Sequence, residues 1–186
     1  EYVSPDEFST AVTHFINNDE HVQFIAYLPR TTHKQRTNLE VISRQYGLES
    51  FQISSYEYGA NKRMPKKSEY YPIQMIEPYN GNQHILGVDF ASNSGIAEYL
   101  QSARDKNEIV AVIEPEVISQ FYTQPLYFLI NPLYAKSTVK ITLKGRQENI
   151  TGFLITAFTL DHLYEFHKAG IELSDIDIRF DIHPNN

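Results

Sequence analysis

The stretch that decides the fold of this chain is residues 70–89, which reads YYPIQMIEPYNGNQHILGVD. Its first seven residues are mostly tyrosine, isoleucine and methionine, a composition typical of a β-strand. If side chains alternate along that strand, Tyr71, Ile73 and Met75 share one face, and the other face carries Tyr70, Pro72, Gln74 and Ile76. Residues 78–82 are rich in turn formers. We therefore predict a strand over residues 70–76 that is followed by a turn.

Three helices are predicted from capping residues and apolar spacing. Ser4 and Glu7 form a capping box with Pro5 at the first helical position, and apolar residues follow at helical spacing in Phe8, Ala11, Val12, Phe15 and Ile16. A second helix is expected to begin after Thr31 or Thr32 and to end at Gly47, with an apolar stripe of Leu39, Ile42 and Tyr46. A third is capped by Ser92, Asn93 or Ser94, and its stripe is Ile96, Tyr99, Leu100 and Ala103.

Strand-length runs of β-branched and aromatic residues accompany these helices at residues 21–28, 51–58, 109–113, 126–133 and 152–158. Near the C-terminus, a short helix is expected over residues 160–168, and apolar residues alternate with polar ones over residues 176–183 as in a strand. Helices interspersed with meandering strands are typical of an α+β sheet domain.

Composition excludes several classes of protein. The chain has 186 residues, 41% of them hydrophobic, which is enough for a folded core. Its net charge of −7 disfavours binding to nucleic acid or to anionic membrane surfaces. It has no cysteine, so disulfides and thiolate sites are excluded. No apolar run approaches the roughly 18 residues that span a bilayer, and the chain begins with Glu1, so we interpret it as an excised part of a longer protein.

Catalysis and metal binding are not indicated. No glycine spacing matches a nucleophile elbow, a P-loop or a dinucleotide fingerprint, and no cofactor is implied. The nearest approach to a metal-binding cluster is Asp161, His162, Glu165 and His167, which we interpret as a solvated helix face. The basic run Lys62, Arg63, Lys66 and Lys67 is either a solvated loop or a contact for an anion or a partner.

Four polar residues beside apolar runs or at a helix end have both a structural and a functional interpretation. Asp89 is expected to be a turn or cap residue, Arg104 an ion-pair partner with Asp89 as the candidate acid, and Asn131 a bulge residue before Pro132. For Glu77, function and structure are equally compatible with the sequence.

Several motifs in order resemble the CHASE domain, the ligand-sensing ectodomain of membrane receptors that include histidine kinases and diguanylate cyclases. The resemblance covers residues 4–163 and rests on residues 70–89 together with these segments: Ser4-Pro5-Asp6-Glu7-Phe8, Tyr27-Leu28-Pro29 followed by Arg36, Glu40, Arg44 and Gly47, Ala103-Arg104, residues 128–134, and residues 152–158 with Asp161-His162-Leu163.

The resemblance implies a tandem PAS-like fold, with a mixed or antiparallel sheet flanked by helices. Residues 1–20 would end an N-terminal helical segment, residues 21–159 would form a membrane-distal ligand-binding subdomain, and residues 160–186 would begin a truncated membrane-proximal one. It also implies a periplasmic sensor domain, not itself an enzyme, that passes a small-molecule signal to a cytoplasmic kinase or cyclase. The receptor would be a homodimer, anchored by transmembrane helices that this chain lacks.

By the same resemblance, a ligand pocket would be lined by strands around Tyr70, Ile109 and Leu126, and its candidate residues are Tyr71, Ile73, Met75, Glu77, Ile113, Phe128 and Asn131. In plant members that bind cytokinins, an aspartate after the tyrosine-x-proline strand bonds the adenine ring. Pro78 occupies that position here, and proline has no side-chain acceptor, so the ligand does not carry over unless Glu77 substitutes.

A rival hypothesis is a periplasmic protein–protein interaction module without a small-molecule site. An enclosed pocket with converging polar groups would favour the sensor, whereas a filled core with an exposed aromatic patch would favour the interaction module.

Overall fold

The computed structural model describes residues 3–55, 62–113, 122–136 and 141–161. Apart from Leu160 and Asp161, the expected helix over residues 160–168 lies outside the described residues. The expected strand at residues 176–183 and the expected second subdomain also lie outside them.

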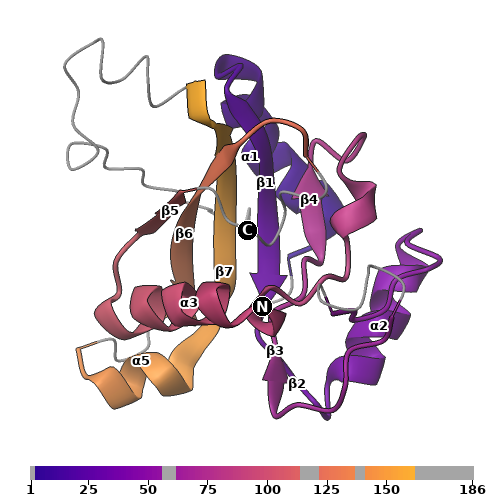
Figure 1. The fold of residues 1–186 in the computed structure, drawn as a ribbon. Helices are drawn as coiled ribbons and strands as arrows, with labels where there is room; N and C mark the ends of the chain where they lie inside the picture. The colour runs from indigo at the N-terminus through magenta and orange to yellow at the C-terminus, as the bar shows by residue number, and fades with distance from the viewer. Residues whose placement is uncertain (1–2, 56–61, 114–121, 137–140, 162–186) are drawn as a thin grey trace.

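Among the described residues, five strands form one antiparallel sheet in the order β4-β1-β7-β6-β5 (Figure 1). They are β1 (Val22–Pro29), β4 (Met75–Glu77), β5 (Val110–Ile113), β6 (Leu126–Tyr134) and β7 (Ile150–Thr159). A separate two-stranded ribbon pairs β2 (Thr31–Thr32) with β3 (Glu69–Tyr70). The α+β class is confirmed, as are the strands predicted at residues 21–28, 109–113, 126–133 and 152–158. Residues 51–55 form only isolated bridges at Ser54, so the strand predicted there is wrong for these five residues.

Helix α1 (Pro5–Asn18) covers one face of the sheet across β1 and β4. The predicted capping box is confirmed: the Glu7 amide donates to Ser4 Oγ at 3.3 Å, and the Ser4 amide donates to Glu7 Oε2 at 2.8 Å. The Ser4 amide and the Ser4 hydroxyl both donate to the Glu7 carboxylate, which holds the pKa of Glu7 below its usual value. Phe8 and Val12 are buried against the sheet, where they form the α1-side core with Ile25, Met75 and Leu154.

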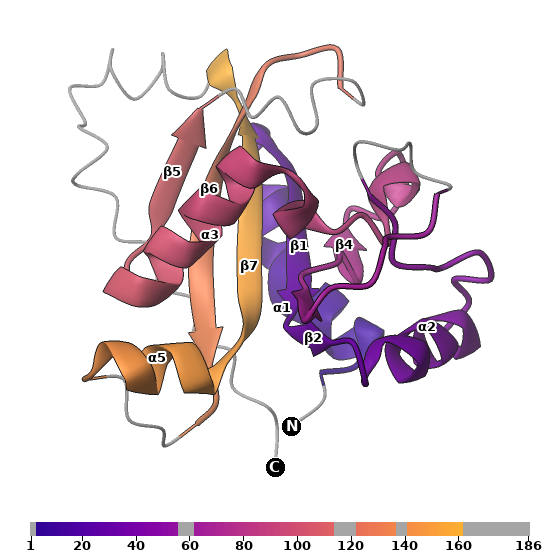
Figure 2. The same cartoon turned by 60° about the horizontal axis from the view of Figure 1, so that its bottom comes forward.

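Helix α3 (Ser94–Lys106) covers the opposite face, as Figures 1 and 2 show. Asn93, one of the three predicted caps, accepts from the Ile96 amide at 3.1 Å. Ile96, Leu100 and Ala103 pack into a larger α3-side core, together with Phe24, Ala26, Leu28, Tyr71, Ile73, Ile76, Ile85, Val88, Phe90, Val112, Leu126, Phe128, Ile130, Ile150, Phe153, Ile155 and Ala157. The short helix α5 (Leu143–Asn149) lies against the C-terminal end of α3, where Arg146 Nε donates to the Asp105 carbonyl at 2.7 Å.

Residues 70–76 do not form one strand, so that prediction is wrong. Strand β3 ends at Tyr70, Ile73 pairs with the loop at Val88, and the chain turns to β1 at Gln74, whose backbone amide donates to the Tyr27 carbonyl. Because the pairing partner changes at Gln74, the alternation shifts by one residue. Tyr71 and Ile73 therefore pack in the α3-side core, whereas Met75 packs in the α1-side core. The prediction that these three residues share a face is wrong for Met75.

Helix α2 (Arg36–Gln45) differs from its predicted pattern at both the start and the buried face. Its N-cap is Gln35, which makes no side-chain cap bond, so neither Thr31 nor Thr32 caps it. The buried residues are Arg36, Glu40 and Ser43, whereas Tyr46 at the end of the predicted apolar stripe is 53% exposed. Gly47 follows with a φ of 91°, the left-handed conformation expected at its end.

Candidate ligand-binding cleft

A buried ion-pair network lies beneath α2 and explains why its polar side faces inward. Arg36 Nε donates to Glu40 Oε1 at 3.0 Å, and Arg63 Nη2 donates to Glu40 Oε2 at 2.9 Å. Arg36 also donates to the carbonyls of Ile53 at 2.9 Å and Met64 at 2.6 Å, and its guanidinium lies 5.1 Å from the centre of the Tyr70 ring. The arginine and glutamate of the helix motif thus fix neighbouring loops to α2.

Asp89 organises the other end of the decisive stretch. Its Oδ1 accepts from the amides of Tyr71 at 2.8 Å and Ala91 at 3.2 Å, which confirms the predicted cap role. Its ion-pair partner is Lys67, with Nζ at 3.1 Å from Oδ2, so a pair with Arg104 is wrong. Arg104 instead pairs with its neighbour Asp105 at 2.6 Å. Two residues of the basic run, Arg63 and Lys67, therefore have structural partners.

The structure separates the seven predicted ligand-binding residues. Tyr71, Ile73 and Phe128 are buried in the α3-side core, where burial raises the pKa of Tyr71. Ile113 lies on the edge strand β5 and is 56% exposed. The other three are Met75, Glu77 and Asn131. Their partners on the neighbouring strands belong to the α1-side core or pack against it, so these three residues lie on the α1 side of the sheet.

The bulge expected at Asn131 is also wrong. Asn131 pairs in register with Leu154, and the irregularity in the pairing of β6 with β7 comes later, between Leu133 and Tyr134.

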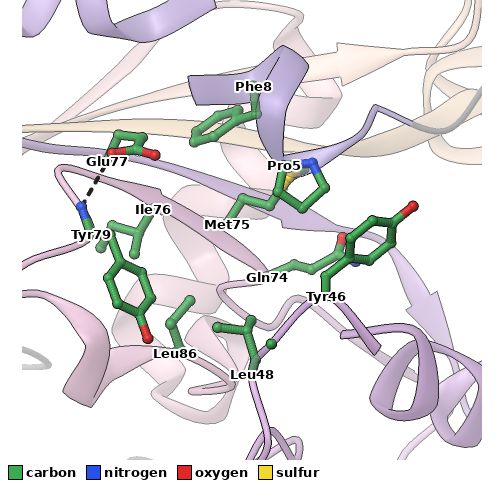
Figure 3. Close-up of a pocket in the computed structure, with 11 residues that line it drawn as sticks. Pro5, Phe8, Tyr46, Leu48, Gln74, Met75, Ile76, Glu77, Tyr79 and Leu86 are labelled. Carbon is green, nitrogen blue, oxygen red and sulfur yellow. Dashed lines mark hydrogen bonds between the residues drawn. The ribbon is translucent and has the colours of Figure 1, made fainter. Parts of the chain in front are cut away.

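Met75 and Glu77 meet in a cleft of about 210 Å³ on the α1 side, between the start of α1, the end of α2 and β4 (Figure 3). The residues around it come from four separated segments of the chain, and they are Pro5, Phe8, Tyr46, Gly47, Leu48, Gln74, Met75, Ile76, Glu77, Tyr79 and Leu86. Such a concave, largely apolar surface with a few polar groups is typical of a small-molecule site.

Gln74 is the most informative polar group in this cleft. Only 4% of the residue is exposed, and its backbone amide donates to the Tyr27 carbonyl at 3.0 Å. Its side chain lines the cleft (Figure 3), and among the described residues its amide has no hydrogen-bond partner. In the part of the chain that the structure describes, the side-chain polar atoms that are fully buried without a partner are the hydroxyls of Ser43 and Ser54, so the Gln74 amide is open to the cleft, where it presents a donor and an acceptor to whatever enters.

Glu77 supplies the ionisable group of the lining. Its Oε2 accepts from the Tyr79 amide at 3.2 Å, the bond drawn in Figure 3. Within the described ranges, neither carboxylate oxygen has an ion-pair partner, and none of the lining residues is a lysine, arginine or histidine. The Glu77–Pro78 peptide bond is cis.

The CHASE domain family profile matches residues 1–185. The chain belongs to the CHASE domain family. It is also similar to hybrid signal transduction histidine kinase A of Dictyostelium discoideum, with 23% identity over 190 residues. That alignment covers 94% of this chain and 9% of the kinase, so the chain spans under a tenth of its relative. The chain is therefore a sensor domain of the kind found in histidine kinases.

In this CHASE domain, the sequence-based prediction missed lining residues of the decisive stretch, namely Gln74, Ile76, Tyr79 and Leu86, and all the lining residues from outside it. Pro5 and Phe8 were predicted as helix residues, and Tyr46 as part of a buried stripe. No local signal marks Tyr46, because an arginine and a glutamate four residues apart usually form an exposed ion pair. Arg36 and Glu40 are buried only through tertiary contacts with distant loops.

Metal binding has no support in the described part of the CHASE domain, where no three histidine, aspartate or glutamate side chains are grouped as metal ligands. Of the four residues considered for such a cluster, His162, Glu165 and His167 lie outside the described residues. Among the helices that the structure describes, none is both long and apolar enough to cross a membrane.

Proposed function

We propose that this CHASE domain is the periplasmic ligand-binding sensor of a transmembrane receptor and that a small molecule binds in the cleft between α1, α2 and β4. The receptor would pass the signal to a cytoplasmic histidine kinase or diguanylate cyclase. Residues 21–159 would be a membrane-distal PAS-like subdomain and residues 160–186 the beginning of a proximal one. The similarity to a hybrid histidine kinase supports the signalling role.

The observation that carries this proposal is the Gln74 side chain. Gln74 lies where the chain passes from pairing with the loop at Val88 to pairing with β1, and its side-chain amide faces a cleft rather than a protein partner. The α3-side core, by contrast, is filled by the protein's own aromatic rings, with Phe24, Phe90 and Phe128 fully buried there. We therefore place the ligand on the α1 side.

Helix α1 would carry the signal. Pro5 and Phe8 form one wall of the cleft, while β4 and the end of α2 form the others. A ligand that contacts both α1 and β4 binds more tightly to conformations in which the walls lie at one particular distance. Binding therefore shifts the population of the protein toward those conformations. In a homodimeric receptor, a shift of α1 in each subunit would change how the subunits pack.

A second candidate function is protein–protein interaction, which the exposed apolar side of α2 favours. Val41 and Tyr46 are 40% and 53% exposed on this helix. A partner protein that covers them would not need the side-chain amide of Gln74, so the two functions differ in their dependence on Gln74.

A thermal-shift screen of the 186-residue chain tests the proposal. The panel would contain purines, amino acids, amines, small carboxylates, sugars and peptides. A ligand at a hundred times its Kd adds about 2.7 kcal/mol to the free energy of unfolding. For a chain of this size we expect a rise in Tm of roughly 5 to 10 °C.

Each hit is then titrated against Gln74→Leu, which keeps the side-chain volume and removes the amide. The matched control is Gln101→Leu, on the exposed side of α3 and outside the cleft. We expect the hit to lose affinity in Gln74→Leu alone. Equal affinity in both variants would overturn the assignment to the cleft, and no hit in any class would favour the interaction module.

A further inference from the structure

The charge of the cleft restricts the chemistry of its ligand. At neutral pH a glutamate carries one negative charge, and Glu77 is half-buried with no cation within ion-pair distance among the described residues. A second anion placed beside it would add repulsion to the cost of desolvation, whereas a cation would make a charge-assisted hydrogen bond. The net charge of −7 on the whole chain acts in the same direction.

The polar groups of the cleft are arranged in a row. Figure 3 shows Gln74 and Glu77 at opposite ends of the lining, with Met75 between them. Three extended residues span at most roughly 10 Å, which sets the scale of the ligand. The apolar middle is completed by Leu48 and Leu86, and Tyr79 lies at the same end as Glu77, with its ring available to a cation.

We infer that the ligand is an amphiphilic amine: an apolar body over Met75 and Leu86, an ammonium group at Glu77, and a hydrogen-bonding group at Gln74. This inference rests on the proposed function, because it names the ligand class of the same cleft. The ammonium group donates to the Glu77 carboxylate oxygen that the Tyr79 amide leaves free. The amide of Gln74 selects molecules that have a carbonyl, hydroxyl or amide at the other end.

The test compares three probes with the same phenylethyl body: phenethylamine, N-acetylphenethylamine and phenylpropionate. The first is a cation, the second is neutral and the third is an anion. Apparent Kd values come from the rise in Tm with probe concentration up to about 10 mM, a range in which millimolar binding is measurable. We expect phenethylamine to bind about tenfold more tightly than phenylpropionate, with N-acetylphenethylamine between them.

The variant Glu77→Gln keeps the size of the side chain and removes its charge, and we expect it to abolish the preference for the amine. The matched control, Glu98→Gln, removes the same charge from the exposed side of α3, outside the cleft, and we expect it to retain the preference. If Glu77→Gln and Glu98→Gln both lose the preference for the amine, that preference comes from the net charge of the chain, and the inference is overturned.

The inference and the proposed function fail in different ways. If library hits depend on Gln74 but the amine is not preferred, or if its preference survives Glu77→Gln, the ligand class is wrong and the sensor function stands. If no compound shows binding that depends on Gln74 or on Glu77, both are wrong.

Discussion

Glu40 has two cationic partners although it lies almost entirely inside the protein. Its two oxygens accept from Arg36 and Arg63, and Oε1 also accepts from the Ile53 amide at 3.1 Å. The partners differ in environment, because the Arg36 side chain is buried and that of Arg63 is 57% exposed. The value of each arginine–glutamate contact should therefore differ.

We predict that Glu40→Ala lowers the free energy of unfolding by about 3 to 5 kcal/mol, because it leaves the Arg36 guanidinium buried without its anion. Arg63→Ala should cost less than about 1 kcal/mol, since solvent can replace an exposed partner. Urea unfolding of both variants measures the difference. Equal losses would show that the network beneath α2 is not held by Glu40.

Gly87 shows a steric constraint at a single residue. Its φ is 83°, and its amide donates to the Ile73 carbonyl at 2.8 Å while its carbonyl accepts from Ser54 at 2.9 Å. A Cβ at this position would overlap the carbonyl oxygen of Gln52. Gly81 has nearly the same φ, 90°, but open space around it.

Alanine substitutions at Gly81 and Gly87 therefore separate the cost of backbone strain from the cost of steric overlap. Gly81→Ala should cost about 1 kcal/mol for the left-handed conformation alone. Gly87→Ala should cost about 3 kcal/mol or more, because three segments must also move apart. Chemical unfolding of the two variants compares these losses, and a Gly87→Ala variant as stable as Gly81→Ala would contradict the packing described at Gln52.

At the scale of elements, the sequence predicted those whose signals are local. The capping boxes and caps at Ser4 and Asn93, and the strands with β-branched runs, depend on neighbours in the chain and are confirmed. Helix α2 was misread because Arg36 and Glu40 find partners in distant loops. The strand at residues 70–76 was misread because its pairing changes at Gln74, which only the tertiary fold determines.

The junction between α3 and α5 should respond to pH through Asp105. The hydrogen bond from Arg104, with a second from Gln147, lowers the pKa of Asp105 from its ordinary value near 3.8. Since the folded pKa is the lower one, the stabilisation is complete above the unfolded pKa and is lost as the pH falls through the folded pKa.

We predict that Asp105→Asn costs roughly 1 kcal/mol or less at neutral pH, because the carboxylate is partly exposed. The difference from wild type should shrink as the pH falls from about 6 to about 2.5. Urea unfolding at several pH values in this range measures the difference. Arg104→Gln should show the same decrease of its difference from wild type as the pH falls. A difference that stays constant with pH would rule out Asp105 as its source.

For the whole molecule, the candidate site was only partly predictable. Met75 and Glu77 were predicted because they belong to the decisive stretch, and they do line the cleft. Gln74, Tyr79 and Leu86 belong to the same stretch but were not predicted, while Tyr46 and Leu48 reach the cleft from the end of α2 and Phe8 from α1. No periodicity relates these segments, so their meeting depends on the packing of α1 and α2 around β4.

The central claim is that a ligand binds in this cleft, and the chain's two methionines allow a direct test. Met75 lines the cleft and Met64 does not, so isotope-labelled methyl groups give one reporter and one internal control. The measurement is the methyl NMR spectrum of the chain during titration with the best compound from the screen. The account predicts that the Met75 signal shifts while the Met64 signal stays in place; a compound that stabilises the chain and leaves Met75 unchanged would contradict it.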